Sequence, residues 1–126
     1  MANELIVIVE DNEQNQKLAR DVLQLKGYRV LVADDAEAGI PLVTKEKPDL
    51  VLMDIHLPGM NGIEALAKLR AAPETKEIPV FAFTASVMAQ DRKEITSAGF
   101  DGFLSKPINV KEFVETIATR LRGGKA

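Results

Sequence analysis

The stretch that decides the fold is Pro48-Asp49-Leu50-Val51-Leu52-Met53-Asp54-Ile55-His56-Leu57-Pro58-Gly59-Met60-Asn61-Gly62. Its apolar residues 50–53 predict a strand that is buried on both faces, and Asp54 stands where that strand should end. The proline and glycines that follow favour a turn, after which a helical period begins at Ile63. A strand, an acid, a turn and a helix form the unit that places chemistry at the carboxyl ends of strands in open α/β sheets. Taken alone, Asp54 is explained at least as well by a structural role in the turn as by a role in a functional site.

Four other apolar runs in the chain are predicted to be strands. They cover residues 5–9, 28–33, 78–83 and 100–104. Segments with helical periodicity separate them, so strands and helices alternate along the whole chain. Strict alternation predicts an α/β protein with a parallel sheet and helices on both faces, because each right-handed crossover returns the chain beside the strand that it has left.

Capping and stop residues bound the first predicted helix. It follows Asn12, whose side chain can accept a hydrogen bond from the first turn, and it ends at Gly27. Leu18, Val22 and Leu25 recur at helical spacing between these two residues, so we expect them to form the apolar face that packs on the sheet.

The later helices carry weaker signals. Asp34 or Asp35 begins the second helix, and Pro41 lies deep enough inside it to predict a kink or a late start. The helix predicted over Val87–Ala98 has a thin apolar face, which indicates weak anchoring and mobility. Asn109 is expected to cap the last helix.

Length and composition limit the classes of protein that fit. The 126 residues fit one domain, which we predict to span residues 1–126, with residues 122–126 as a frayed tail. The chain has no cysteine, so neither disulfides nor thiolate metal sites are expected, and its net charge of −3 argues against a general nucleic-acid binder. No apolar run approaches the ~20 residues needed to cross a bilayer. We therefore expect a cytoplasmic protein without membrane insertion.

Polar residues follow four of the predicted strands. Glu10 and Asp11 follow the first, Asp54 the third, Thr84 the fourth and Lys106 the fifth. Because parallel strands end at one edge of a sheet, these side chains are expected to gather there. Each has a plain structural explanation as a cap, a turn residue or a surface charge, but one shared site explains all of them together.

Five segments carry a resemblance to a known family: Ile8-Val9-Glu10-Asp11-Asn12, Pro48-Asp49-Leu50-Val51-Leu52-Met53-Asp54, Leu57-Pro58-Gly59-Met60-Asn61-Gly62, Thr84-Ala85 and Gly102-Phe103-Leu104-Ser105-Lys106-Pro107. With them, the sequence resembles the receiver domain of two-component response regulators over nearly its whole length. The resemblance implies a flavodoxin-like, doubly wound, five-stranded parallel sheet in strand order 2-1-3-4-5. With no output domain after Leu121, the chain is most similar to single-domain regulators of the DivK kind, although receiver fragments of hybrid kinases look alike.

By this resemblance, Asp54 is the phosphoacceptor, which attacks a phosphohistidine on a histidine kinase or a histidine phosphotransfer protein. Close carboxylates repel one another, so the implied cofactor is a hard cation, Mg²⁺ or Mn²⁺. Its implied ligands are Asp11, Asp54 and the backbone carbonyl of His56, with Glu10 acting through water. Lys106 offers a second cation to the phosphoryl group. Such a protein catalyses its own phosphorylation and dephosphorylation but is a signalling protein, not a metabolic enzyme.

The resemblance also implies a switch. The Thr84 hydroxyl turns toward the phosphoryl group, and the ring of Phe103 moves inward, although many relatives have tyrosine at that second position. Pro107 is expected to follow a cis peptide bond that turns Lys106 into the site. A downstream effector protein is expected to bind the face formed by residues 87–98, Phe103 and the last helix.

Other classes of protein share part of this pattern. A haloacid-dehalogenase-type phosphohydrolase needs a second aspartate two residues after the first, where this chain has His56. A flavodoxin-like FMN binder needs a hydroxyl-rich phosphate loop after the first strand, where Glu10 and Asp11 would repel phosphate. A P-loop NTPase needs a glycine-rich Gly-Lys motif that the sequence lacks. A docking domain that is never phosphorylated stays open, and incubation with Mg²⁺ and acetyl phosphate distinguishes it.

Overall fold

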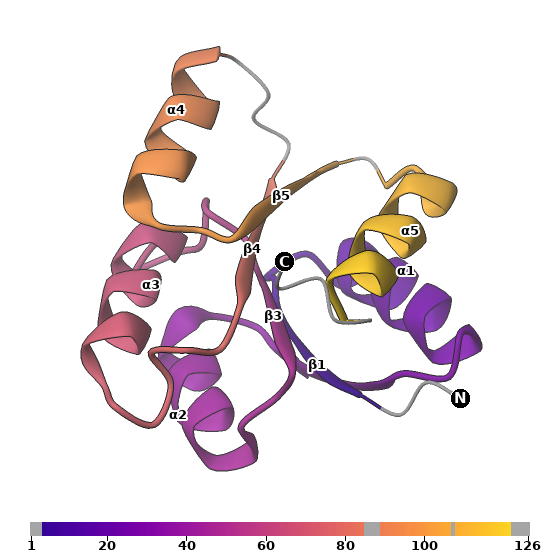
Figure 1. Ribbon diagram of the computed structural model, residues 1–126, viewed down its shortest axis with the longest axis horizontal. Helices are drawn as coiled ribbons and strands as arrows, with labels where there is room; N and C mark the ends of the chain where they lie inside the picture. The colour runs from indigo at the N-terminus through magenta and orange to yellow at the C-terminus, as the bar shows by residue number, and fades with distance from the viewer. Residues whose placement is uncertain (1–3, 85–88, 107, 122–126) are drawn as a thin grey trace.

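Figure 1 presents the computed structural model, which describes residues 4–84, 89–106 and 108–121. The strands are β1 Leu5–Val9, β2 Arg29–Ala33, β3 Leu50–Met53, β4 Val80–Thr84 and β5 Gly102–Ser105. The helices are α1 Glu13–Leu25, α2 Ala36–Glu46, α3 Gly62–Ala71, α4 Ala89–Ala98 and α5 Val110–Leu121. None of these described helices has the length and apolar character needed to cross a membrane. All strand pairs are parallel and the order is β2-β1-β3-β4-β5, so the predicted flavodoxin-like architecture is confirmed.

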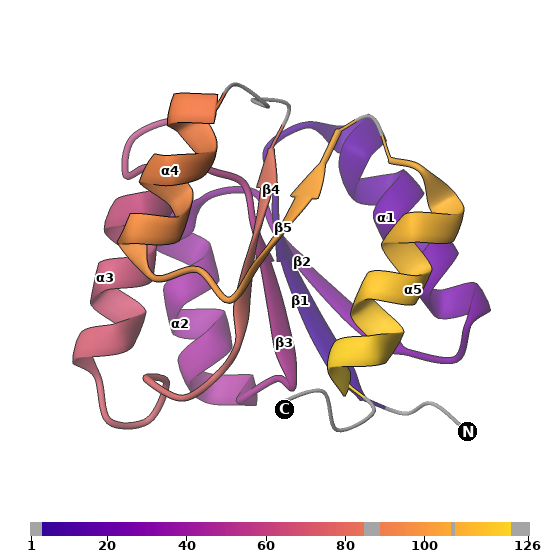
Figure 2. The same ribbon diagram turned by 45° about the horizontal axis from the view of Figure 1, so that its top comes forward.

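Helices cover both faces of the sheet. Figures 1 and 2 show α1 and α5 on one face and α2, α3 and α4 on the other. Ile6 and Ile8 of β1 belong to the core beneath α1 and α5. Val7 and Val9 alternate with them and belong to the core beneath α2 and α3. Every residue of β1 and β3 is buried, which explains why these strands are continuously apolar in sequence.

The strand register sets the first polar residues side by side. Val9 at the end of β1 pairs with Met53 at the end of β3. Glu10 and Asp54 therefore follow neighbouring strands at the same level, and the backbone N–H of Asp54 donates to the carbonyl of Val9 at 3.0 Å. The register of the two central strands is therefore sufficient to place two carboxylates at one edge of the sheet, whatever the conformation of the loops.

Three strands begin one or two residues later than predicted. β2, β4 and β5 begin at Arg29, Val80 and Gly102, where the sequence pattern predicted residues 28, 78 and 100. Pro79 explains the case of β4, because proline has no N–H to give to a central strand. β4 also ends one residue later than predicted, at Thr84, so the strand backbone itself positions the Thr84 side chain.

The apolar face predicted for α1 is only partly correct: Val22 packs against the core, but Leu18 and Leu25 do not lie on the buried face. Leu18 and Leu25 are 43% and 84% exposed, and the residues that face the protein interior are Gln16, Ala19 and Leu23. Both sets have helical spacing, so periodicity alone cannot choose between them. Packing favours the second set because the small Ala19 side chain packs in the core against the sheet, while the amide of Gln16 donates a hydrogen bond to Asp34.

Of the two effects expected from Pro41 in α2, the late start is wrong and the kink stays a prediction. The helix begins at Ala36, because Asp35 is its N-cap and accepts an N–H of the first turn at 2.8 Å. It then continues through Pro41. Gly39 anchors this first turn on the sheet, since a Cβ atom there would lie 2.8 Å from Cγ2 of Val9. The cap and this close approach fix the start of the helix upstream of the proline.

The helix predicted over residues 87–98 is α4 in the described part of the chain, and residues 87 and 88 lie outside that part. Ile95 is its buried apolar residue, at 3% exposure, and it packs with Ile55 and Ala82. The helix lies beside α3 in both views (Figures 1 and 2). The side chains of residues 89–92 and 94 lie outside the described ones, so the thin apolar face of this helix stays a prediction.

Candidate functional site

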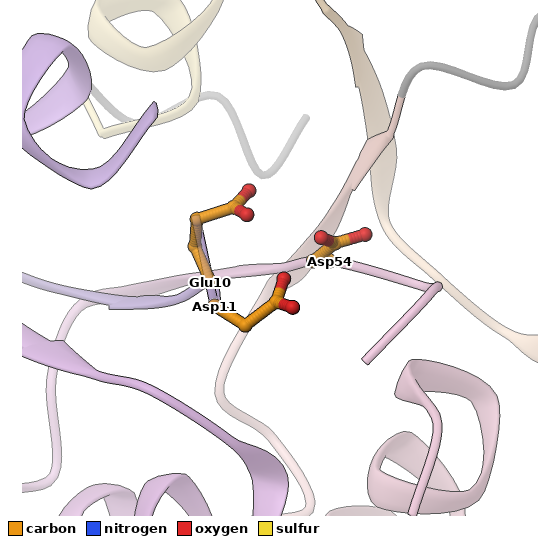
Figure 3. Close-up of side chains that lie close together, drawn as sticks. All are labelled: Glu10, Asp11 and Asp54. Atoms are coloured by element: carbon orange, nitrogen blue, oxygen red, sulfur yellow. The ribbon is translucent and has the colours of Figure 1, made fainter. Parts of the chain in front are cut away.

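Three carboxylates meet at the carboxyl edge of the sheet. Figure 3 shows Glu10 and Asp11, which follow β1, beside Asp54, which follows β3. One oxygen of each side chain lies within 4.8 Å of the others. Glu10 and Asp54 are buried whereas Asp11 is exposed, so the cluster opens to solvent on the side of Asp11. Like charges at this separation repel, and the cluster therefore attracts positive charge.

Lys106 supplies positive charge to this cluster. Its backbone N–H donates to the carbonyl of Thr84 at 3.0 Å, which holds it at the end of β5 beside β4. Its ammonium group donates to Oε1 of Glu10 at 2.5 Å and to Oδ2 of Asp54 at 3.0 Å. The lysine side chain is only 12% exposed, so water screens these ion pairs weakly. Lys106 thus ties the two buried carboxylates together.

Burial and ion pairing shift the pKa values of two of these groups. Burial alone would lower the pKa of the Lys106 ammonium, but its hydrogen bonds to Glu10 and Asp54 outweigh burial and raise that pKa above 10.5. Burial raises the pKa of the Glu10 carboxyl above 4.5, and hydrogen bonds from Lys106 and the Asn12 N–H offset part of the rise. The ring centroid of Phe83, 5.0 Å from the ammonium, adds a cation–π contact. Lys106 therefore stays charged.

The turn after β3 orients Asp54. Its Oδ1 accepts the backbone N–H of His56 at 2.9 Å, which leaves Oδ2 for Lys106. The turn closes where the Gly62 N–H donates to the carbonyl of Ile55 at 3.0 Å. A Cβ atom on Gly62 would lie 2.4 Å from the carbonyl oxygen of Asp54, so only glycine fits this position. The predicted turn is confirmed. It packs closely against the backbone of Asp54, and this packing requires glycine at position 62.

Hydrogen bonds from two helices hold the rest of this turn. Asn61 and Glu64 form a capping box at the start of α3, in which each side chain accepts the backbone N–H of the other, at 2.9 and 3.0 Å. Glu37 of α2 accepts the N–H of Met60 at 3.3 Å. The segment that carries Asp54 and His56 is therefore held at one end by β3 and at the other by the hydrogen bonds at the start of α3.

The structure places the remaining predicted site residues as follows. Thr84 is fully buried at the end of β4, and Phe103 is half-buried in β5, packed against the cluster that contains Ile95. The His56 side chain is exposed, and the role of its carbonyl as a metal ligand stays a prediction. Pro107 lies outside the described residues. Geometry thus joins the three carboxylates and Lys106 directly, with Thr84 on the neighbouring strand.

The sequence reasoning missed Gln16. Its Nε2 donates to the backbone carbonyl of Glu10 and, at 2.7 Å, to Oδ1 of Asp34. The missed signal was a polar residue at helical spacing from Ala19 and Leu23, which forms the buried face of α1 with them.

A cavity of about 170 Å³ is lined by residues of β5, of α5 and of the segment between them. Its lining residues are Phe103, Leu104, Ser105, Asn109, Glu112, Phe113 and Thr116. Both aromatic and polar side chains line it, and Phe103 connects it to the cluster beneath α4.

The donor set of the acidic cluster fits a hard divalent cation. Mg²⁺ prefers oxygen ligands, is bound in proteins by one or two carboxylates and keeps several of its waters. Glu10, Asp11 and Asp54 offer carboxylate oxygens in one place, and the exposed Asp11 leaves an open side where such waters can remain. Neither imidazole nor thiolate ligands are needed.

Comparisons with known proteins agree with this geometry. Residues 6–118 match the family described as response regulator receiver domain. The chain is 40% identical over 116 residues to the polar-differentiation response regulator DivK of Brucella anthropi, and the alignment covers 92% of this chain and 94% of that protein. DivK of Brucella ovis is similar to the same extent, with the same identity and coverage.

Solved structures with the same fold include two bacterial proteins. A putative response regulator from Chloroflexus aurantiacus matches with a TM-score of 0.90 and 28% identity, over 95% of this chain and 98% of that one. The receiver domain of a sensor histidine kinase from Pseudomonas aeruginosa matches with a TM-score of 0.86 and 31% identity, over 96% and 98% of the two chains. That second structure contains a magnesium ion coordinated in its active site cleft.

Proposed function

Because this chain belongs to the response regulator receiver domain family of two-component signalling, we propose that Asp54 accepts a phosphoryl group from a phosphohistidine of a histidine kinase or a histidine phosphotransfer protein. One observation carries the proposal: the Asp54 carboxylate accepts a hydrogen bond from Lys106 and has an oxygen within 4.8 Å of carboxylate oxygens of Glu10 and Asp11. An acidic cluster of this kind is typical of the magnesium site of receivers. The acid, the cation and the metal-ligand candidates thus share one pocket.

The covalent part of the transfer step falls to Asp54 alone, as the nucleophile. A carboxylate oxygen of Asp54 attacks phosphorus, a P–O bond forms, and the P–N bond breaks so that the imidazole leaves with its electron pair. Lys106 lies 3.0 Å from Oδ2 of Asp54 and can neutralise charge on the phosphoryl oxygens. The N–H of His56 holds Oδ1 and fixes the plane of the carboxylate. Catalysis by these residues is positioning and charge stabilisation.

Glu10, Asp11 and Asp54 are the residues that would hold Mg²⁺, with the backbone carbonyl of His56 as a further oxygen ligand. When bound, the ion neutralises the carboxylates and the incoming phosphoryl group. Both oxygens of Glu10 already have partners, namely the Lys106 ammonium at 2.5 Å and a backbone N–H at 2.9 Å. Contact between Glu10 and the ion through a water molecule therefore disturbs fewer existing bonds than direct ligation.

The proposed output surface is the face formed by α4, β5 and α5. Thr84 turns its hydroxyl toward the phosphoryl group, and Phe103 moves into the space that this turn vacates. Phe103 supports the proposal because it packs near Ile95 of α4 and also lines the cavity beside α5. A shift of this ring therefore reaches both helices, where an effector protein would read it.

Incubation with acetyl phosphate tests the proposed function. We expect the wild type to acquire one hydroxylamine-labile phosphoryl group in Mg²⁺ and none in EDTA. Asp54→Asn should abolish labelling, because an amide is not a nucleophile toward phosphorus, whereas the matched exposed variant Asp21→Asn should label as the wild type does. Equal labelling of the Asp54→Asn and Asp21→Asn proteins would exclude Asp54 as the acceptor.

A further inference from the structure

Gln16 is a buried polar residue that the proposed transfer step does not use. It is 9% exposed on the inner face of α1, between the segment after β1 and the segment after β2. We propose that Gln16 is a positioning residue that sets the direction of the metal-binding carboxylates, an inference that rests on the proposed function. It acts through a backbone carbonyl and touches neither the metal nor the phosphoryl group.

Gln16 acts on the peptide unit that joins Glu10 to Asp11. The carbonyl that accepts from Nε2 of Gln16 belongs to this unit, so the hydrogen bond fixes the plane of the peptide. The N–H of Glu10 is held as well, by the carbonyl of Ala33 at 3.0 Å. The orientation of this peptide plane determines the direction in which the Asp11 side chain leaves the backbone. Gln16 therefore influences the direction of Asp11, the exposed member of the acidic cluster.

The chemistry of the contact requires an amide at position 16. Both partners of Nε2, the Glu10 carbonyl and the Asp34 carboxylate, are pure acceptors, so a group with two N–H donors is needed between them. An apolar side chain of equal size would fill the space but leave the buried carbonyl without its donor. A carboxylate would place oxygen against oxygen. Volume alone does not explain the residue.

Asp34 gives this contact an outer anchor. It lies in the connection between β2 and α2, and its Oδ1 accepts the second N–H of the Gln16 amide at 2.7 Å. A primary amide held by two acceptors from different segments cannot rotate freely about its last bond. The chain of contacts from Asp34 through Gln16 to the Glu10 carbonyl thus links the start of α2 to the acidic cluster.

Magnesium affinity of the unphosphorylated protein, measured by isothermal titration calorimetry, tests the inference. Gln16→Met keeps the volume and removes both donors, and we expect it to weaken Mg²⁺ binding roughly tenfold, as is typical when a partner of a metal ligand is lost. Gln14→Met is the matched control, because Gln14 is exposed on the same helix, and it should bind as the wild type does. At saturating Mg²⁺, the phosphorylation rate of Gln16→Met should return to near the wild-type rate.

Two variants of Asp34 separate the hydrogen bond from the charge. Asp34→Asn keeps an oxygen acceptor for the amide and should bind Mg²⁺ nearly as well as the wild type. Asp34→Ala removes the acceptor and should bind more weakly than Asp34→Asn. Asp34 is exposed, so these variants remain informative if Gln16→Met does not fold. In the double variant with Gln16→Met, Asp34→Ala should cause no further loss of affinity.

The outcomes are distinct. If the wild type binds Mg²⁺ and is phosphorylated while Gln16→Met matches Gln14→Met in affinity, the inference is wrong and the proposed function stands. Equal affinities of Asp34→Ala and Asp34→Asn overturn it in the same way. A general loss of stability is detected with Ile117→Val, a core change in α5, which should lower the melting temperature without changing Mg²⁺ affinity. If the wild type neither binds Mg²⁺ nor becomes phosphorylated, the proposed function fails and this inference fails with it.

Discussion

Lys106→Met should destabilise the protein through charge, not through volume. The lysine side chain is 12% exposed and donates to Glu10 at 2.5 Å and to Asp54 at 3.0 Å. At an effective dielectric constant of about 20, each ion pair at such distances is worth roughly 5 kcal/mol before desolvation is subtracted. Removing one partner of a buried pair costs about 3–5 kcal/mol in practice. The open side of the cluster admits water, so we expect the lower end, about 3 kcal/mol.

The stability loss expected for Lys106→Met is large enough to measure by thermal unfolding. For a chain of 126 residues, 3 kcal/mol corresponds to a fall in melting temperature of roughly 10 °C. The assay is thermal unfolding of both proteins in EDTA, followed by circular dichroism. Lys111→Met removes a charge from an exposed position at the start of α5 and should shift the melting temperature by no more than about 2 °C. A melting temperature of Lys106→Met equal to that of Lys111→Met would refute the assignment of Lys106 to the cluster.

The same variant should show a diagnostic dependence on pH. Burial raises the pKa of Glu10 above 4.5 and Lys106 offsets part of that rise, so the pKa rises further without the lysine. A carboxyl whose pKa is higher in the folded state binds more protons when folded, and the free energy of unfolding then falls as pH rises from 4.5 through the folded pKa. The stability difference between wild type and Lys106→Met should therefore grow over this window and level off above it. A difference that shrinks as pH rises contradicts the argument.

The other predictions concern packing, metal binding and output. Gly62→Ala should destabilise the protein by about 3 kcal/mol or more in chemical denaturation, because its Cβ atom would lie 2.4 Å from the carbonyl oxygen of Asp54 and backbone must move to admit it. Asp11→Asn should weaken Mg²⁺ binding at least tenfold by calorimetry without lowering the melting temperature in EDTA, because it removes one of three mutually repelling charges, and an unchanged affinity would exclude Asp11 as a ligand. Thr84→Ala should leave Asp54 phosphorylatable but reduce the chemical-shift changes that phosphorylation causes in Phe103, and full-size changes there would assign the coupling to other residues.

The sequence determined the architecture because the relevant signals are local. Continuous apolar runs, such as residues 50–53, identify strands buried on both faces, and capping residues such as Asn12 and Asn109 mark where helices begin. Parallel strands that alternate with helices leave few permitted topologies, and all of them put the ends of the strands at one edge. The sequence alone therefore predicts that Asp54 and the residues after β1 share one edge of the sheet.

The tertiary structure decided which groups within that site contact one another. Lys106 and Glu10 are 96 residues apart in sequence, and no local pattern shows that both carboxylate neighbours share one ammonium group. The rotation of α1 was equally hidden, because Leu18 and Ala19 both fit a helical period and only packing against the sheet chose between them. That choice buried Gln16 beside the acidic cluster. Periodicity gives the spacing of a helix face but not its direction, and direction is fixed only by contacts between segments distant in sequence.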